Sequence, residues 1–204
     1  MDTLLLNADG QPLSMLPVSI VSWQTAIKFL MLGKVKVMCE HDWEVRSPSM
    51  SMKVPSIIMS TKYVKWPKSV KFNRYNLYLR DDFTCQLQIT SRCARDHGKG
   101  HSVAELTLDH ITPKSNGGNN SWLNLVTACA TCNHHKGNAK IVPKRMPAIP
   151  SYFELIEKRR KSVITISDLS WLDYLGWDED LVYYHPHGGQ RVKLTDYLNQ
   201  GDVK

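Results

Sequence analysis

The amino-acid sequence predicts an α+β fold whose central unit is a strand, a loop, a second strand and a short helix. Residues 105–109 alternate polar and apolar side chains, as a half-buried strand does, and residues 125–127 form a second apolar run. Residues 130–136 suit a helix that Gly137 ends. Such a small unit has too little core to fold alone, so we expect a metal ion to hold it together.

We divide the chain into an N-terminal α/β region, a basic aromatic arm, the central unit and a helical C-terminal segment, at residues 1–61, 62–80, 81–142 and 143–204. In the first region, Leu4–Leu6 predicts a strand, and Ser22 caps a helix from Trp23 to Leu32 whose apolar stripe packs a core. Residues 35–39 alternate like a half-exposed strand. We expect Cys39 to be a small buried apolar residue.

The arm carries a cation at every third position: Lys62, Lys65, Lys68, Lys71 and Arg74. Aromatic residues lie between these cations, and no aspartate or glutamate occurs from residue 45 to residue 80. Pro67 argues against a continuous helix, so we expect an extended arm. Such a segment can follow a nucleic-acid backbone, or it can be a solvated linker. We favour DNA contact, because the arm leads directly into the central unit.

Polar residues at the ends of the predicted strands indicate hydrolytic chemistry. Asp109 and His110 lie at the end of the first strand, and Asn133 lies near the start of the helix. Carboxylate and amide oxygens are hard ligands that suit Mg²⁺ or Mn²⁺. His110 could then remove a proton from water, and the cation could bind a phosphate oxygen. This combination is typical of phosphodiester hydrolysis.

Two thiols three residues apart, Cys129 and Cys132, supply half of a Zn²⁺ site. The chain has five cysteines, and its first residues contain no basic segment before the apolar ones, so we expect no signal peptide. Thiols bound to metal in a reducing cytoplasm are therefore favoured over disulfides.

The segment from Leu106 to Gly137 resembles the HNH endonucleases of the His-Me finger superfamily, which have a ββα-metal nuclease core. The resemblance is carried by Asp109-His110, Gly117-Gly118, Trp122-Leu123-Asn124-Leu125-Val126 and the run from Ala128 to Gly137. It implies that His110 is the general base and that Asp109 and Asn133 bind the catalytic cation. It also implies that Asn124 orients the loop that follows His110.

The resemblance extends from about Leu4 to Leu181 through shorter matches to stand-alone bacterial HNH proteins. These matches are Val21-Ser22-Trp23-Gln24, Arg46-Ser47-Pro48-Ser49, Leu79-Arg80-Asp81 and Ser170-Trp171-Leu172-Asp173-Tyr174-Leu175.

The chain departs from the family where most relatives have a second Cys-x-x-Cys pair. It has Cys85 but Gln88 in place of the second thiol, and a neutral amide is a poor Zn²⁺ ligand. We expect Cys93 to be the fourth ligand, with His97 and His101 as alternatives. A site that no longer binds Zn²⁺ is the remaining possibility.

The net charge of +7 is unevenly distributed along the chain. Residues 1–80 carry 11 lysines and arginines against 5 acidic residues, and residues 81–150 carry 8 against 5. Residues 151–204 carry 7 against 9. The excess of cations before and within the central unit implies a polyanionic substrate. No apolar run reaches the ~18 residues of a membrane span, so we expect no membrane partner.

The C-terminal segment begins with Ser151 and Glu154, which form a capping box for a helix that runs to about Arg160. We expect a hydrophobic patch formed by Trp171, Leu172, Leu175 and Trp177 to dock this segment onto the rest of the chain. His185 and His187 lie in a Tyr-His-Pro-His-Gly-Gly run that reads as a turn, not a metal site. Residues after Leu181 give no usable signal.

We therefore expect a metal-dependent DNA endonuclease of bacterial or phage-infected cytoplasm, with a catalytic Mg²⁺ or Mn²⁺ and a structural Zn²⁺. We expect Lys114 and Lys136 to bind DNA together with the arm. His134 and His135 could contact phosphate or metal, but the plainer interpretation is that they are exposed surface residues. The alternatives are a zinc-stapled nucleic-acid-binding module without cleavage and an RNA nuclease. Double-stranded DNA is the expected partner, and a homodimer stays open.

Overall fold

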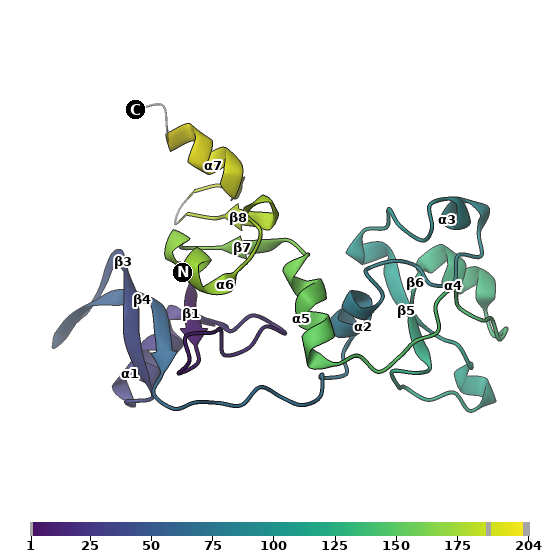
Figure 1. Cartoon of the computed structure of the whole chain (residues 1–204), viewed down its shortest axis with the longest axis horizontal. Helices are drawn as coiled ribbons and strands as arrows, with labels where there is room; N and C mark the ends of the chain where they lie inside the picture. The colour runs from purple at the N-terminus through teal and green to yellow at the C-terminus, as the bar shows by residue number, and fades with distance from the viewer. Residues whose placement is uncertain (1, 187–188, 202–204) are drawn as a thin grey trace. The chain divides into compact units, whose positions relative to one another are not determined.

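A computed structural model describes residues 2–186 and 189–201 of the chain, which form two compact units (Figure 1). The first unit combines residues 2–66 with residues 159–201, and the second is the intervening stretch, residues 67–158. The second unit is therefore inserted in sequence between the two segments of the first. His187, part of the predicted turn, lies outside the described residues.

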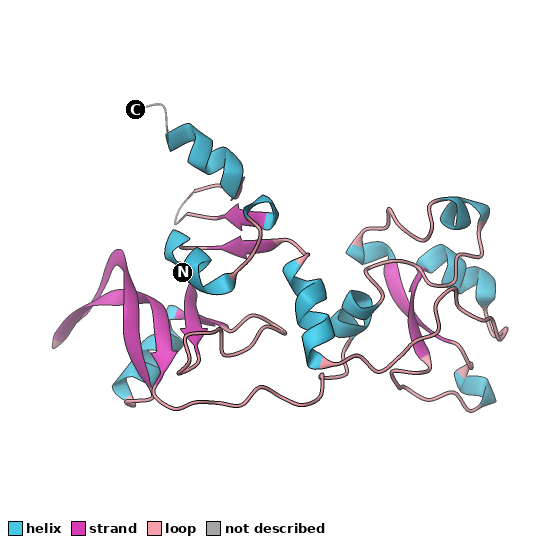
Figure 2. Ribbon diagram, viewed as in Figure 1, coloured by secondary structure: helices cyan, strands magenta, loops and turns pink. Residues whose placement is uncertain are grey.

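The first unit contains a four-stranded sheet of order β2-β1-β4-β3, and β1 runs parallel to β4. Its N-terminal elements are β1 (Asp2–Leu6), β2 (Ile20–Ser22), α1 (Trp23–Met31), β3 (Val35–Ser47) and β4 (Met50–Ser60). Figure 2 shows β3 and β4 as long strands joined by a tight turn. The sequence predicted only the start of β3 and missed β4, which contains Pro55. This proline lies opposite Glu40, where the pairing register shifts, a position that tolerates a missing backbone N–H.

The helix α1 begins and packs as its sequence predicts. The Ser22 hydroxyl accepts a hydrogen bond from the backbone N–H of Thr25, which caps the first turn. Ala26 is buried against Leu5 and Ile58 of the sheet. Cys39 is half-buried, which corrects the expectation of a fully buried residue.

The C-terminal segment folds onto this sheet through Trp171, which is 1% exposed. Its indole N–H donates to the backbone oxygen of Ser56 at 3.0 Å, and Nδ1 of His41 lies 2.9 Å from a carboxylate oxygen of Asp168. Leu175 and Trp177 are also buried, and Leu172 is half-buried. Trp171 thus makes the expected contact with the sheet, whereas the indole N–H of Trp177 donates to Ser162 of its own segment.

The C-terminal segment contains the expected helices, and three short strands that the sequence did not predict alternate with them. The elements are β7 (Ile164–Ile166), η3 (Leu169–Trp171), α6 (Leu172–Leu175), η4 (Glu179–Leu181), β8 (Val182–Tyr184), β9 (Val192–Lys193) and α7 (Leu194–Gly201). The strands form a sheet of order β7-β8-β9. Each strand has at most three residues, too few for alternation to be recognised in the sequence.

The second unit is built around an antiparallel hairpin followed by a helix. Its elements are α2 (Arg74–Arg80), α3 (Ser91–Arg95), η1 (Val103–Glu105), β5 (Leu106–His110), η2 (Lys114–Asn116), β6 (Leu125–Cys129), α4 (Ala130–Lys136) and α5 (Tyr152–Arg160), whose last two residues belong to the first unit. The predicted order of strand, loop, strand and helix is confirmed. So is the capping box, in which Ser151 and Glu154 exchange hydrogen bonds at 2.7 and 3.2 Å.

The expectation of an extended arm from residue 62 to residue 80 is wrong for its last seven residues, which form α2. Asn73 caps this helix by accepting a hydrogen bond from the N–H of Asn76. Leu77 and Tyr78 bury their side chains. Pro67 precedes the helix and therefore does not interrupt it. No helix in the described part of the chain has the length and apolarity needed to cross a membrane.

Candidate active site and thiol cluster

Asp109 lies near the end of β5 with its carboxylate buried at 7% exposure. Oδ1 accepts a hydrogen bond of 3.3 Å from Nζ of Lys136. The same ammonium lies 3.0 Å from Oδ2 as an ion-pair partner, and Oδ2 accepts no hydrogen bond. Asp109 therefore has a counter-charge beside it and one buried oxygen with unused acceptor capacity.

Lys136 is the one expected DNA-binding residue that the structure buries. It is 3% exposed and comes from the last turn of α4, where it faces Asp109 of β5. The expectation that Lys136 faces a DNA phosphate is therefore corrected. A buried ammonium needs an anionic partner, and Asp109 supplies it.

Asn133 lies one helical turn before Lys136 on α4. Its amide nitrogen is 3.5 Å from the hydroxyl of Thr107, two residues before Asp109 on β5. Thr107 and Asp109 are on the same face of the strand, because strand side chains alternate. The carboxylate and the amide thus belong to one face of the hairpin, which α4 covers. The side-chain oxygens of Asp109 and Asn133, including Oδ2 of Asp109, are ligands of the kind that a hard divalent cation prefers.

His110 ends β5 and is half-buried. Its Nε2 lies 2.8 Å from the side-chain oxygen of Asn120, in the loop between β5 and β6. Asn120 was not among the site residues predicted from the sequence. The only signal for it was its place in an Asn-rich run after Gly117-Gly118, which is not specific to any role.

Asn124 holds the loop that follows His110. Its Oδ1 accepts from the backbone N–H of Thr112 at 2.9 Å, and its amide nitrogen donates to the backbone oxygens of Thr112 and Asn119 at 3.1 and 2.9 Å. Gly118 sits so close to this contact that a Cβ there would lie 1.7 Å from the Thr112 oxygen. The loop therefore requires glycine at this position, and Asn124 ties its two ends together.

Four cysteines gather in the core of the second unit: Cys85, Cys93, Cys129 and Cys132. All four are buried, and their sulfur atoms lie within 4.8 Å of one another. A tetrahedral Zn²⁺ with Zn–S bonds of about 2.3 Å holds its sulfurs about 3.8 Å apart. The cluster therefore fits a structural Zn²⁺ with small adjustments.

Local structure explains how the thiols of the cluster meet. Cys129 is the N-cap of α4, and its sulfur accepts a hydrogen bond from the N–H of Cys132 at 3.4 Å. Cys93 comes from α3, which folds back so that Cys85 donates its backbone N–H to Gly98 at 2.8 Å. Nε2 of His101 lies 3.6 Å from the Cys93 sulfur, outside the thiol set. His97 is exposed, and Gln88 is half-buried.

The thiols differ in their tendency to ionise. Burial raises the pKa of Cys93 and raises that of Cys129 to about 11. Burial also opposes ionisation of Cys132, but hydrogen bonds from the Thr90 backbone and hydroxyl outweigh it and lower the pKa to about 7. Four buried thiolates in contact repel one another, so their joint ionisation requires a cation among them.

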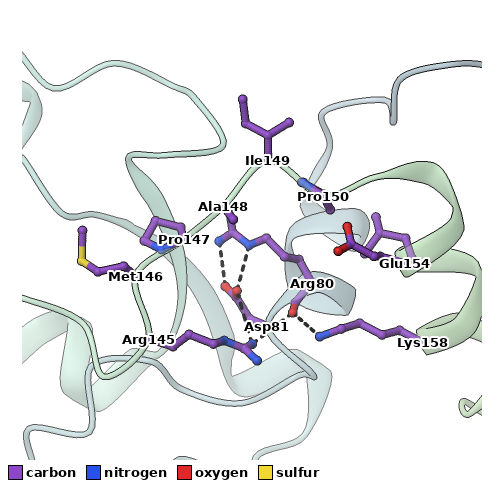
Figure 3. Close-up of a pocket in the computed structure, with 11 residues that line it drawn as sticks. Arg80, Asp81, Arg145, Met146, Pro147, Ala148, Ile149, Pro150, Glu154 and Lys158 are labelled. Atoms are coloured by element: carbon purple, nitrogen blue, oxygen red, sulfur yellow. Dashed lines mark hydrogen bonds and ion pairs between the residues drawn. The ribbon is translucent and has the colours of Figure 1, made fainter.

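Figure 3 shows a buried ion pair between Arg80 and Asp81, and both side chains also bind the backbone of β6. Arg80 donates to both carboxylate oxygens of Asp81 at 2.9 and 3.0 Å, and it also donates to the backbone oxygen of Leu125 at 2.7 Å. Asp81 accepts from the N–H of Thr127 at 2.8 Å. Figure 3 also shows Lys158 reaching the backbone oxygen of Arg80, beside a pocket of about 260 Å³. This pair fixes the strand that connects Asn124 to Cys129.

The remaining expected DNA-binding residues are exposed: Lys62, Lys65, Lys68, Lys71, Arg74 and Lys114. Lys62 and Lys65 belong to the first unit, where the Asn7 side chain holds the Val64 backbone through two hydrogen bonds of 2.8 Å. The others belong to the second unit.

Near Lys71, Phe72 packs edge-on against Trp122 with ring centroids 5.2 Å apart. The end of the arm therefore lies against the segment that carries Asn124. His134 and His135 are exposed on α4, which agrees with the plainer interpretation of both residues.

A hairpin and helix with a buried carboxylate, an adjacent histidine and a thiol cluster define a ββα nuclease unit. Residues 98–144 match the family model described as HNH endonuclease, and residues 3–68 match the model described as HNH endonuclease-associated, N-terminal domain. Both matches support the HNH endonuclease family, as the resemblance indicated. Comparisons with curated proteins and with solved structures gave no match.

Proposed function

We propose that the chain is a metal-dependent DNA endonuclease that hydrolyses phosphodiester bonds. His110 is the general base, and Asp109 and Asn133 hold one Mg²⁺ or Mn²⁺. A structural Zn²⁺ is held by four thiolates, which belong to Cys85, Cys93, Cys129 and Cys132. The observation that carries the proposal is the buried Oδ2 of Asp109, which accepts no hydrogen bond although an ammonium lies 3.0 Å away.

The chain's own residues account for the other steps. His110 takes a proton from the attacking water through the ring nitrogen that does not contact Asn120. Asn124 keeps the loop after His110 in place, so that the imidazole has a fixed position relative to β5. Asp109 and Asn133 would hold the divalent cation, which would supply positive charge for the phosphate and the leaving oxygen.

Exposed cations support DNA as the substrate. Lys71, Arg74 and Lys114 belong to the same unit as His110, and their ammonium and guanidinium groups are available to phosphates. We take double-stranded DNA as the substrate and the reducing cytoplasm of a bacterial or phage-infected cell as the setting. A reducing compartment leaves the buried thiols available to Zn²⁺.

The test is incubation of the purified chain with supercoiled plasmid, with Mg²⁺ or Mn²⁺ omitted and then restored. Relaxed or linear products that depend on the added cation are expected, and the product topology distinguishes nicking from a double-strand break. An RNA of similar length, run in parallel, measures the preference for DNA. A binding module without cleavage would shift the plasmid in a gel and leave it supercoiled.

His110→Ala is the decisive variant. Loss of a general base lowers the rate by about 10²–10⁴-fold, and DNA affinity should stay close to that of the parent chain. His134→Ala is the matched control, because His134 is an exposed histidine in the same unit. A His110→Ala protein that cleaves as fast as this control contradicts the assignment of the base.

A further inference from the structure

The contact between His110 and Asn120 determines which ring nitrogen of the histidine carries hydrogen. Nε2 of His110 lies 2.8 Å from Oδ1 of Asn120. An amide oxygen can only accept a hydrogen bond, so Nε2 must be the donor. In the neutral imidazole, Nδ1 then has the free lone pair.

Asn120 is held in place by the hydrogen bonds of the loop around it. The backbone oxygen of Asn119 accepts from the amide nitrogen of Asn124 at 2.9 Å, and the Ser121 hydroxyl donates to the Asn119 side chain at 2.9 Å. The same Asn124 side chain binds both backbone groups of Thr112, two residues after His110. One asparagine thus fixes the distance between the histidine and the loop segment that contacts it.

We propose that Asn120 is a positioning residue that holds His110 in the tautomer with hydrogen on Nε2 and directs proton uptake to Nδ1. This inference rests on the proposed function, in which His110 is the general base. Without an acceptor at Asn120, the neutral ring can place its hydrogen on either nitrogen and can rotate. The fraction of molecules in which Nδ1 of His110 has a free lone pair directed at the attacking water then falls. Asn124 acts one step further away, through the Asn119 carbonyl.

The tautomer can be measured without any cleavage. Long-range ¹H–¹⁵N correlation spectra of the whole chain, at a pH where the histidines are neutral, distinguish the two tautomers of each imidazole. His110→Ala identifies the His110 signals by their loss. We expect the Nε2–H pattern for His110 in the parent chain and a mixed or Nδ1–H pattern in Asn120→Ala. Asn120→Asp keeps an acceptor oxygen, so it should retain the Nε2–H pattern.

Cleavage rates give the second readout. Asn120→Ala should cleave plasmid about 10-fold or more slower than the parent chain, but less slowly than His110→Ala, whose loss is about 10²–10⁴-fold. Asn120→Asp should recover most of this rate. Asn116→Ala is the control, because the Asn116 side chain lies in the same loop and accepts a hydrogen bond from the Ser115 hydroxyl. It should change neither the tautomer nor the rate.

The outcomes separate this inference from the nuclease proposal. Retention of the Nε2–H pattern in Asn120→Ala overturns the inference, whether or not the chain cleaves DNA. If Asn120→Ala changes the tautomer of His110 but cleaves as fast as the parent chain, the positioning role of Asn120 is overturned. If the tautomers behave as expected but the parent chain cleaves no nucleic acid, the nuclease proposal fails and the hydrogen-bond assignment stands.

Discussion

The ammonium of Lys136 lies 3.0 Å from Oδ2 of Asp109, and both side chains are buried. The carboxylate that we propose as a cation ligand therefore has a fixed positive partner within the protein. A buried carboxylate without a partner is costly, so Lys136 explains how Asp109 is tolerated when no cation is bound. Cation binding then has to share Asp109 with this ammonium.

Lys136→Met should destabilise the fold, because it leaves the Asp109 charge buried without its partner. Breaking a buried pair from one side costs about 3–5 kcal/mol of unfolding free energy. Adding Asp109→Leu to the same protein should recover a large part of this loss, since no isolated charge remains. Denaturant unfolding measures both effects, with Lys140→Met, an exposed lysine just after α4, as the control. A Lys136→Met protein as stable as this control contradicts the role of the pair.

Asn133→Ala and Asp109→Ala should each lose cleavage through the catalytic cation and keep their Zn²⁺ content. The cysteine cluster uses sulfur ligands, whereas these two residues offer oxygen to a separate cation. Raised Mn²⁺ should partly restore Asn133→Ala, because Asp109 remains as a ligand. Metal analysis and plasmid cleavage are the two measurements. Loss of Zn²⁺ in Asn133→Ala would show that the two sites had been confused.

The local sequence pattern was enough to predict the hairpin and its helix. Alternation in residues 105–109 and the glycine after Lys136 are short-range signals, and the helix bounds agree with those predicted. The Asp109–Lys136 pair could not be predicted in this way. The two residues are 27 positions apart, and only the packing of α4 on β5 buries the lysine. In the sequence, a buried lysine such as Lys136 cannot be distinguished from an exposed lysine at the end of a helix.

The Asn120 contact was missed for a related reason. A surface loop rich in asparagine has many possible hydrogen bonds, and the closure of the loop by Asn124 selects among them. The β3–β4 hairpin was missed because its partner strand contains a proline, which usually argues against a strand. The deciding feature is an irregular backbone in both cases: the loop that Asn124 closes, and the shift of register beside Pro55.

Neutralising the four arm lysines, Lys62, Lys65, Lys68 and Lys71, should weaken DNA binding with little dependence on sequence. All four are exposed, so each is available to a phosphate. The plot of log affinity against log salt should flatten by about 0.9 for each phosphate contact that is lost. Substituting four exposed lysines outside the arm, Lys28, Lys34, Lys36 and Lys53 of the first unit, controls for net charge. An unchanged salt slope in the arm variant returns the arm to the role of a linker.

Cys93→Ser should lower bound Zn²⁺ and thermal stability about as much as Cys129→Ser does. The chain lacks the second thiol of the usual pair after Cys85, and α3 instead brings Cys93 within 4.8 Å of the other three sulfurs. Structural Zn²⁺ contributes about 10–16 kcal/mol in small domains, more than a typical domain's whole stability. Removal of any one ligand should therefore affect folding of the second unit.

Cys39→Ser is the matched control for this prediction, because Cys39 is half-buried on β3 and is outside the thiol cluster. Its metal content should equal that of the parent chain. His101→Ala tests the nearest alternative ligand, whose Nε2 lies 3.6 Å from the Cys93 sulfur. If Cys93→Ser keeps one full equivalent of Zn²⁺ and its melting temperature while His101→Ala loses both, the histidine is the fourth ligand and Cys93 is not.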